Sequence, residues 1–128
     1  MWLQGDQRIA AVGEAPYQDA ICAICKSTTW DDVRFECMAY VLPEPDNRND
    51  PNATKVMVEG LLVAYLSRGD TVDYGVAVRA MFSQGRVIAC DAMIAGRGPG
   101  SETSNVGVFL HLPTPGEALR MVSPPPPP

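Results

Sequence analysis

Residues 33–58 read VRFECMAYVLPEPDNRNDPNATKVMV, two apolar stretches on either side of a loop rich in Pro, Asp and Asn. In residues 33–42 the odd positions are apolar and share one face, while the even positions share the other face. This alternation predicts a strand. Pro restricts φ, and Asp and Asn side chains bond nearby backbone groups, so we expect residues 43–52 to form an ordered loop. An ordered polar loop between two strands is a common place for a binding site.

Apolar runs on both sides of this stretch predict the remaining elements. Five further strands are expected at residues 8–12, 53–58, 61–66, 86–95 and 106–112. A tight turn is expected at Glu59-Gly60, and a Gly/Ser loop at residues 96–104. Helices are expected at 17–27, where apolar residues recur at helical spacing, and at 72–83, which Gly85 would end in a left-handed cap. The order β-α-β-β-β-α-β-β predicts an α+β, mainly β fold. Six strands with two short helices suggest a small mixed barrel or a strongly bent sheet.

The length of 128 residues suits one domain with a single core. We expect a lead-in at residues 1–8, the domain at 9–112 and a Pro-rich tail at 113–128. Residues 124–128 are all Pro, which predicts extended polyproline II and a segment that could dock on a partner protein.

The net charge of −5 counts against tight, non-specific binding of nucleic acid. No run approaches the ~20 apolar residues of a membrane-spanning helix, so no membrane is expected as a partner. The first residues show neither a basic nor an apolar leader region, so the cytoplasm is the expected compartment.

Four cysteines could carry chemistry. Cys22 and Cys25 form a CxxC pair on one face of the first expected helix, and Cys37 and Cys90 lie inside expected strands. Zinc binding and a redox pair are both possible roles for such residues. Because the CxxC lies mid-helix among apolar residues and no second CxxC exists, we favour simple buried thiols.

Other polar residues give no catalytic pattern. His111, the sole histidine, alternates with leucines in the last strand, and Asp91 is the only charge in residues 86–95. We interpret His111 as a structural strand residue; Asp91 either faces solvent or lines a groove. The Asp and Asn residues of the loop do not have the spacing of an EF-hand. We therefore expect no enzyme activity, no metal and no cofactor.

Three segments together resemble the HIRAN domain, a small module found fused to chromatin-remodelling helicases and also alone in bacteria and phages. They are VGEAPYQ at residues 12–18, EPDNRNDPNATKV at 44–56 and VAYLSR at 63–68. The middle segment is the most specific of the three. The resemblance implies an OB-like barrel with two helices.

Members fused to remodellers hold single-stranded DNA at a free 3′ end, so the resemblance implies a binding module of that kind. Asp50 would accept a hydrogen bond from the terminal hydroxyl, with Asn47 beside it, and Tyr17 would support the pocket. Tyr65 and Arg68 would face a phosphate. The site implied by the resemblance is Tyr17, Asn47, Asp50, Lys55, Tyr65 and Arg68.

The chain departs from that pattern in ways that leave alternatives open. Pro16 and Asn49 stand where the DNA-binding members have aromatic residues, and Ala15 stands where they have Arg. Asp50 and Asn52 also suit a purely structural role as turn-forming residues. The alternative function is a protein-interaction or structural module, phage- or virion-associated, that keeps the fold without binding DNA ends.

Overall fold

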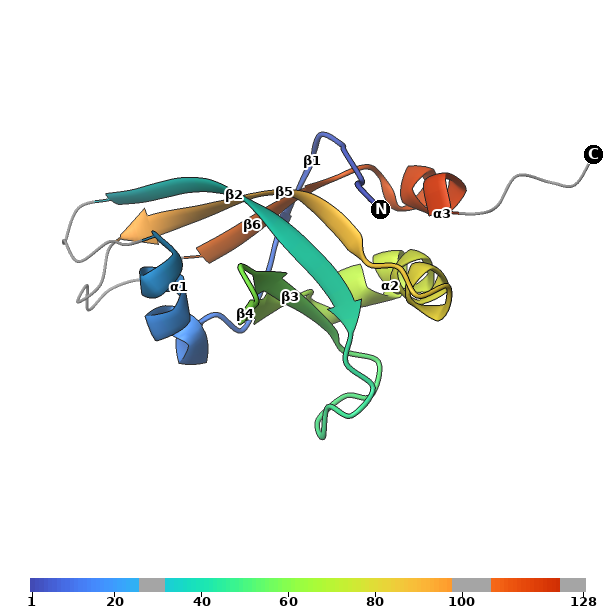
Figure 1. The fold of residues 1–128 in the computed structure, drawn as a ribbon, viewed down its shortest axis with the longest axis horizontal. Coiled ribbons are helices and arrows are strands. Elements are labelled where there is room, and N and C mark those ends of the chain that lie inside the picture. Colours follow the sequence, from blue (N-terminus) through green and yellow to red (C-terminus); the bar gives the residue numbers. More distant parts are fainter. Residues whose placement is uncertain (26–31, 98–106, 123–128) are drawn as a thin grey trace, which may run out of the picture.

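Six antiparallel strands and three α-helices make up the described part of this computed structural model, which covers residues 1–25, 32–97 and 107–122 (Figure 1). In the sheet, the strands lie in the order β1-β6-β5-β2-β3-β4. The elements in chain order are β1 (Gln7–Ala10), the 3-10 helix η1 (Ala15–Tyr17), α1 (Gln18–Cys25), β2 (Asp32–Pro43), β3 (Thr54–Val58), β4 (Leu61–Tyr65), α2 (Arg68–Ser83), β5 (Ile88–Arg97), β6 (Gly107–Leu112) and α3 (Pro115–Val122).

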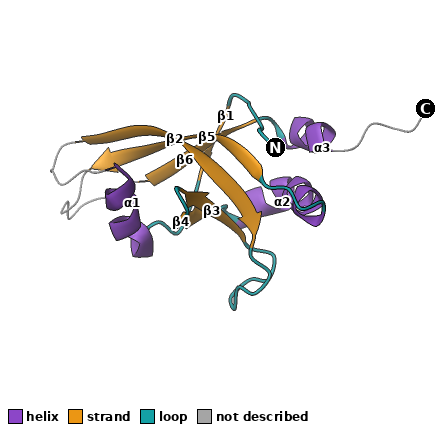
Figure 2. Ribbon diagram, viewed as in Figure 1, coloured by secondary structure: helices purple, strands orange, loops and turns teal. Residues whose placement is uncertain are grey.

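The pairing of β2 with β5 is the longest in the sheet and forms its centre. Ala39 lies opposite Cys90 and Val41 opposite Ile88, and all four side chains are buried. The alternation predicted in residues 33–42 is confirmed over residues 34–42, where the odd positions face the core and the even positions face outward. Figure 2 shows α1 and α2 on the same side of these two long strands.

The predicted α+β class and the six strands are confirmed, and the sheet is open, with β1 and β4 at its two ends. The chain that follows β1 nevertheless reaches β4. Val12 and Tyr65 exchange two backbone hydrogen bonds, of 2.8 and 2.9 Å, as an isolated antiparallel bridge. One residue pair therefore connects the segment after one edge strand to the opposite edge strand.

The hairpin of β3 and β4 has the predicted tight turn. Glu59 and Gly60 have φ of 52° and 78°, so both central residues are left-handed, as a type I′ turn requires. Gly60 adopts this conformation without steric cost, and its partner Glu59 is the one non-glycine residue with positive φ in the described chain.

Helix α2 begins four residues earlier than the sequence predicted, because Ser67 caps it. The Ser67 hydroxyl accepts the Asp70 backbone N–H at 3.1 Å and donates to the Asp70 carboxylate at 3.0 Å. The first of these bonds satisfies one backbone donor of the first turn, and the second fixes the Ser67 hydroxyl in place. The helix ends as predicted, with Gly85 at φ 73° just past its last turn.

The expectation of two helices is wrong, because a third helix, α3, follows Pro113. The Thr114 hydroxyl caps it, accepting the Glu117 backbone N–H and donating to the Glu117 carboxylate at 2.7 Å. Ala118 and Val122 are buried, and the Tyr74 hydroxyl of α2 donates to the Pro113 carbonyl at 2.7 Å. The beginning of the expected Pro-rich tail therefore packs on the domain.

Some expectations lie outside the described residues: residues 26–27 of the first helix, residues 98–104 of the Gly/Ser loop, residue 106 of the last strand and the polyproline at 124–128. The first two residues of the expected loop, Gly96 and Arg97, instead belong to β5. Among the described helices, none combines the length and the apolar character that crossing a membrane would need.

Replacement of Ile94 by Ala should destabilise the protein by about 3 kcal/mol, since the side chain is fully buried between strands and its removal leaves a cavity. Leu61→Ala is the control, because Leu61 is 41% exposed at the hairpin and should lose less than about 1 kcal/mol. Urea unfolding followed by circular dichroism measures both. Equal losses in the two variants would contradict this description of the core.

Candidate functional site

The loop that joins β2 to β3 is held by its own side chains. The Asn47 side-chain oxygen accepts the backbone N–H groups of Asn49 and Asp50 at 2.9 and 3.0 Å. One carboxylate oxygen of Asp50 accepts the Asn52 N–H at 2.9 Å. The Ala53 N–H donates to the Asp50 carbonyl at 3.0 Å. These bonds form successive Asx turns, so the loop is ordered as its composition predicts.

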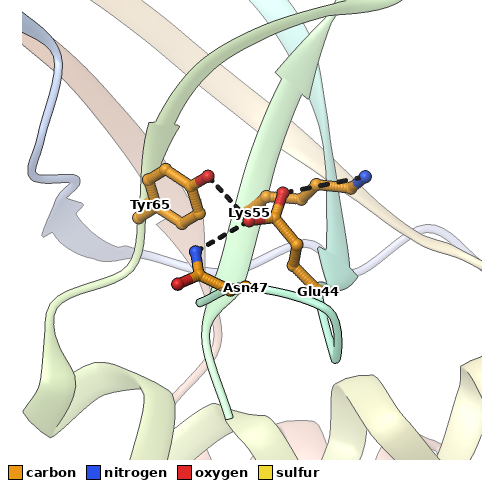
Figure 3. Close-up of polar contacts among 4 residues, drawn as sticks. All are labelled: Glu44, Asn47, Lys55 and Tyr65. Atoms are coloured by element: carbon orange, nitrogen blue, oxygen red, sulfur yellow. Dashed lines mark hydrogen bonds and ion pairs between the residues drawn. The ribbon is translucent and has the colours of Figure 1, made fainter. Parts of the chain in front are cut away.

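Glu44 is the centre of a polar network at the base of this loop (Figure 3). Its Oε1 accepts two hydrogen bonds of 2.8 Å, one from the Tyr65 hydroxyl and one from Asn47 Nδ2. Its Oε2 lies 4.0 Å from the Lys55 ammonium. The Glu44 side chain is 17% exposed and that of Lys55 is 30% exposed. A partly buried carboxylate is stabilised by such donors and by the nearby positive charge.

The strands bring these groups together. Lys55 of β3 and Tyr65 of β4 are cross-strand partners, so their side chains lie on the same face of the hairpin. Glu44 directly follows β2, and its backbone N–H donates to the Ala53 carbonyl at 2.9 Å. The network therefore ties the two ends of the loop to the adjacent hairpin.

Tyr17 completes the site from η1. Its ring centroid lies 6.4 Å from that of Tyr65, with the ring planes at 50°, a tilted aromatic contact. Burial raises the pKa of Tyr65, and the hydrogen bond to Glu44 and the neighbouring Tyr17 side chain raise it further. Tyr65 therefore remains protonated and continues to donate to Glu44 throughout the physiological pH range.

Five of the six residues implied by the resemblance meet in or beside this network: Tyr17, Asn47, Asp50, Lys55 and Tyr65. Arg68 is exposed at the start of α2, three residues after Tyr65, and forms no polar contact within the described chain. Pro16 and Asn49, at the positions where aromatic residues were expected, are both exposed.

Sequence reasoning missed Glu44, although it lies in the quoted loop motif. The signal that was overlooked is its position directly after a strand and before Pro45, where a carboxylate can face the neighbouring hairpin. Asp50 takes the turn-forming role that the sequence left open for Asp50 and Asn52, while Asn52 joins that turn through its backbone N–H. Asn47 forms a turn of the same kind. That role uses one Asp50 carboxylate oxygen, and a carboxylate can accept about four hydrogen bonds.

The four cysteines are free thiols, with Cys90 buried and Cys22, Cys25 and Cys37 half-buried. Burial, together with neighbouring thiols and Glu59, raises the pKa of Cys25 and of Cys37 to about 11. Burial raises the pKa of Cys90 to about 12, with a further contribution from Asp91. These shifts favour unreactive thiols. Within the described ranges, no three His, Cys, Asp or Glu groups come together to hold a metal ion.

Asp91 and His111 are cross-strand partners in β5 and β6. Asp91 is exposed and His111 is half-buried, both on the face of the sheet opposite the core. Asp91 also lines a hollow with Glu36 and His111, so both roles considered for it, solvent-facing and groove-lining, apply.

Comparisons of this chain with protein families, with curated proteins and with solved structures find no match.

Tyr65→Phe should lower the free energy of unfolding by about 1 kcal/mol, because Glu44 loses a hydrogen-bond donor in a half-buried position. The matched control is Tyr40→Phe, since Tyr40 is exposed and its hydroxyl makes no hydrogen bond to the described residues. Urea unfolding measures both variants. A loss that is the same for Tyr40→Phe would contradict a specific role for the Tyr65–Glu44 bond.

Alkylation of Cys25 and Cys37 by iodoacetamide at pH 8 should be about 100-fold slower than in the urea-unfolded chain, because a pKa raised from 9.0 to about 11 leaves far less thiolate. Peptide mass spectrometry over time gives the rate for each cysteine. Rates that do not change on unfolding would contradict the raised pKa of these thiols.

Proposed function

We propose that this protein is a non-catalytic binding module for single-stranded DNA with a free 3′ hydroxyl, bound at the loop between β2 and β3. The single observation that supports this most is the Glu44 network, which holds the loop against Tyr65 before any ligand arrives. A preorganised site loses less conformational entropy on binding. The module acts in the cytoplasm, and the resemblance to HIRAN domains is part of the same proposal.

Asp50 selects the unblocked end. One of its carboxylate oxygens is occupied by the Asn52 N–H, which fixes the orientation of the group, and the other oxygen makes no hydrogen bond within the described chain. That oxygen accepts a hydrogen bond from a terminal hydroxyl. A 3′ phosphate would be repelled, because both groups are negative.

Tyr17 and Tyr65 supply the surface for the last nucleotide. The resemblance implied that Tyr65 faces a phosphate, but its hydroxyl donates to Glu44, so we assign its ring to the base instead. The Glu44 bond holds the Tyr65 ring, and Tyr17 packs against it at 6.4 Å. A base that stacks on such a ring gains about 1–3 kcal/mol. With Pro16 and Asn49 at the neighbouring positions, this pair is the aromatic contribution of the site.

Phosphate contacts come from the few basic residues near the loop. The Lys55 ammonium already pairs with the Glu44 carboxylate, while the side chains of Arg48 and Arg68 are exposed. Because the net charge is −5, the affinity is low and decreases with salt, with a slope near −0.7 per phosphate contacted.

We also propose that the sheet works as an OB-like barrel. The two hydrogen bonds between Val12 and Tyr65 support this, since they join the segment after β1 to the edge strand β4. In that arrangement Tyr65 serves twice, with its backbone at the junction and its side chain in the binding site.

Asp50→Asn should abolish the preference for a free 3′ end. Asn retains the oxygen that accepts the Asn52 N–H, so the turn remains, but the negative charge is lost. Fluorescence anisotropy at low salt compares a short single strand bearing a 3′ hydroxyl with the same strand bearing a 3′ phosphate. Wild type should prefer the hydroxyl by about tenfold, as expected for a charge-assisted hydrogen bond worth ~1.5 kcal/mol, and Asp50→Asn should bind both strands alike.

The control variant is Asp46→Asn, which removes an exposed charge from the same loop without a hydrogen bond to the described residues. It should keep the hydroxyl preference. If wild type binds neither strand up to millimolar protein, DNA-end binding is refuted, and the protein-interaction alternative takes its place.

A further inference from the structure

The outer face of β2, β5 and β6 is the unpartnered face of the sheet. It lies on the side away from α1 and α2 in Figure 1. Met38 is 40% exposed and Tyr40 is 37% exposed, and both belong to β2. On the neighbouring strands Met93 and Phe109 are half-buried. Exposed apolar side chains on a central strand indicate a surface that another molecule covers.

This face leads into a groove. One hollow of about 380 Å³ lies over the sheet, with Glu36, Asp91 and Met93 among its lining residues. A second hollow of about 510 Å³ reaches the start of α3, with Glu117 and Met121 in its lining. Both hollows include residues 4–6, so they adjoin.

Gly5, which both hollows share, lies in a close backbone contact. A Cβ placed on Gly5 would overlap the Pro113 nitrogen and the Leu112 carbonyl carbon. No side chain fits there without movement of the backbone, so the chain at Gly5 lies directly against the junction of β6 and α3. Gly5 therefore holds residues 4–6 against the sheet where the two hollows meet.

The lining of the groove is negative. Its charged residues are four carboxylates, and neither hollow has a lysine or arginine in its lining. These carboxylates belong to Asp6, Glu36, Asp91 and Glu117. The hydrogen bond donated by the Thr114 hydroxyl lowers the pKa of Glu117, which keeps this group charged. Arg8, the cation on β1 beside His111, instead stacks over the Phe109 ring at 4.0 Å from its centroid.

We propose that this groove binds an extended, basic segment of a partner protein, with arginine or lysine at alternate positions and apolar residues between them. Charge complementarity selects the basic residues, and their aliphatic stems pack on Met93 in the groove and on Met38 beside Asp91, while the apolar residues between them face away from the sheet. The same carboxylates repel phosphates, so the surface is distinct from the loop proposed for DNA.

The spacing of the carboxylates supports a peptide as the occupant. Met38 lies opposite Asp91 and Glu36 opposite Met93, so Glu36 and Asp91 are diagonal neighbours on the same face. Diagonal neighbours lie about 7–8 Å apart. In an extended chain, alternate side chains lie about 6.6–6.8 Å apart on one side. Two cationic side chains at positions i and i+2 therefore match these two carboxylates.

The test uses a fluorescein-labelled nine-residue peptide of alternating Arg and Val, added to the full chain and followed by anisotropy at low salt. The double variant Glu36→Gln/Asp91→Asn should bind about tenfold more weakly, as expected for the loss of two exposed ion pairs. Both side chains are exposed, so the fold should be unaffected, and circular dichroism verifies this.

The matched control is Asp19→Asn/Asp73→Asn, which removes the same charge from exposed positions on α1 and α2 outside the groove. It should bind the peptide within about threefold of wild type, since distant exposed charges are screened. No binding by wild type, or an equal loss in both double variants, would overturn the proposal.

Discussion

The antiparallel pairing of β2 with β5 is the constraint on which the rest of the structure depends. Its inner side chains, such as Ala39, Cys90 and Ile94, are removed from water, so a shift of one residue would turn the core face outward. The same register orders the rest of the sheet, with β3 and β4 on one side and β6 and β1 on the other. Both proposed binding surfaces derive from it, since β2 ends at the loop and its outer face lines the groove.

The two surfaces differ in how their charges are used. At the loop, the Glu44 carboxylate accepts hydrogen bonds from Tyr65 and Asn47 and pairs with Lys55. Its negative charge therefore organises the site and is largely compensated. In the groove, the carboxylates of Glu36 and Asp91 point to solvent and remain available to a ligand. An acidic protein can in this way bind an anion where its local negative charge is neutralised and a cation where that charge is not neutralised.

Much of the fold was predictable because its signals are local. Alternation over residues 33–42 identified β2, and the turn at Glu59 and Gly60 identified the hairpin. Helix α3 was missed because Pro-rich composition suggested an extended chain, although Thr114 and Glu117 form a capping box that the sequence already contains. The start of α2 was also misplaced, because the capping role of Ser67 was overlooked.

The sequence by itself determined the strands, the ordered loop and the identity of most side chains around it, because alternation and Asx turns depend on neighbours in the chain. Only the tertiary structure decided which groups meet. The bond from Tyr65 to Glu44 spans 21 residues, and Tyr17 reaches Tyr65 from a separate element. The groove joins residues 4–6 to Asp91 and Glu117. Such contacts depend on the order of the strands in the sheet, which no local pattern in the chain encodes.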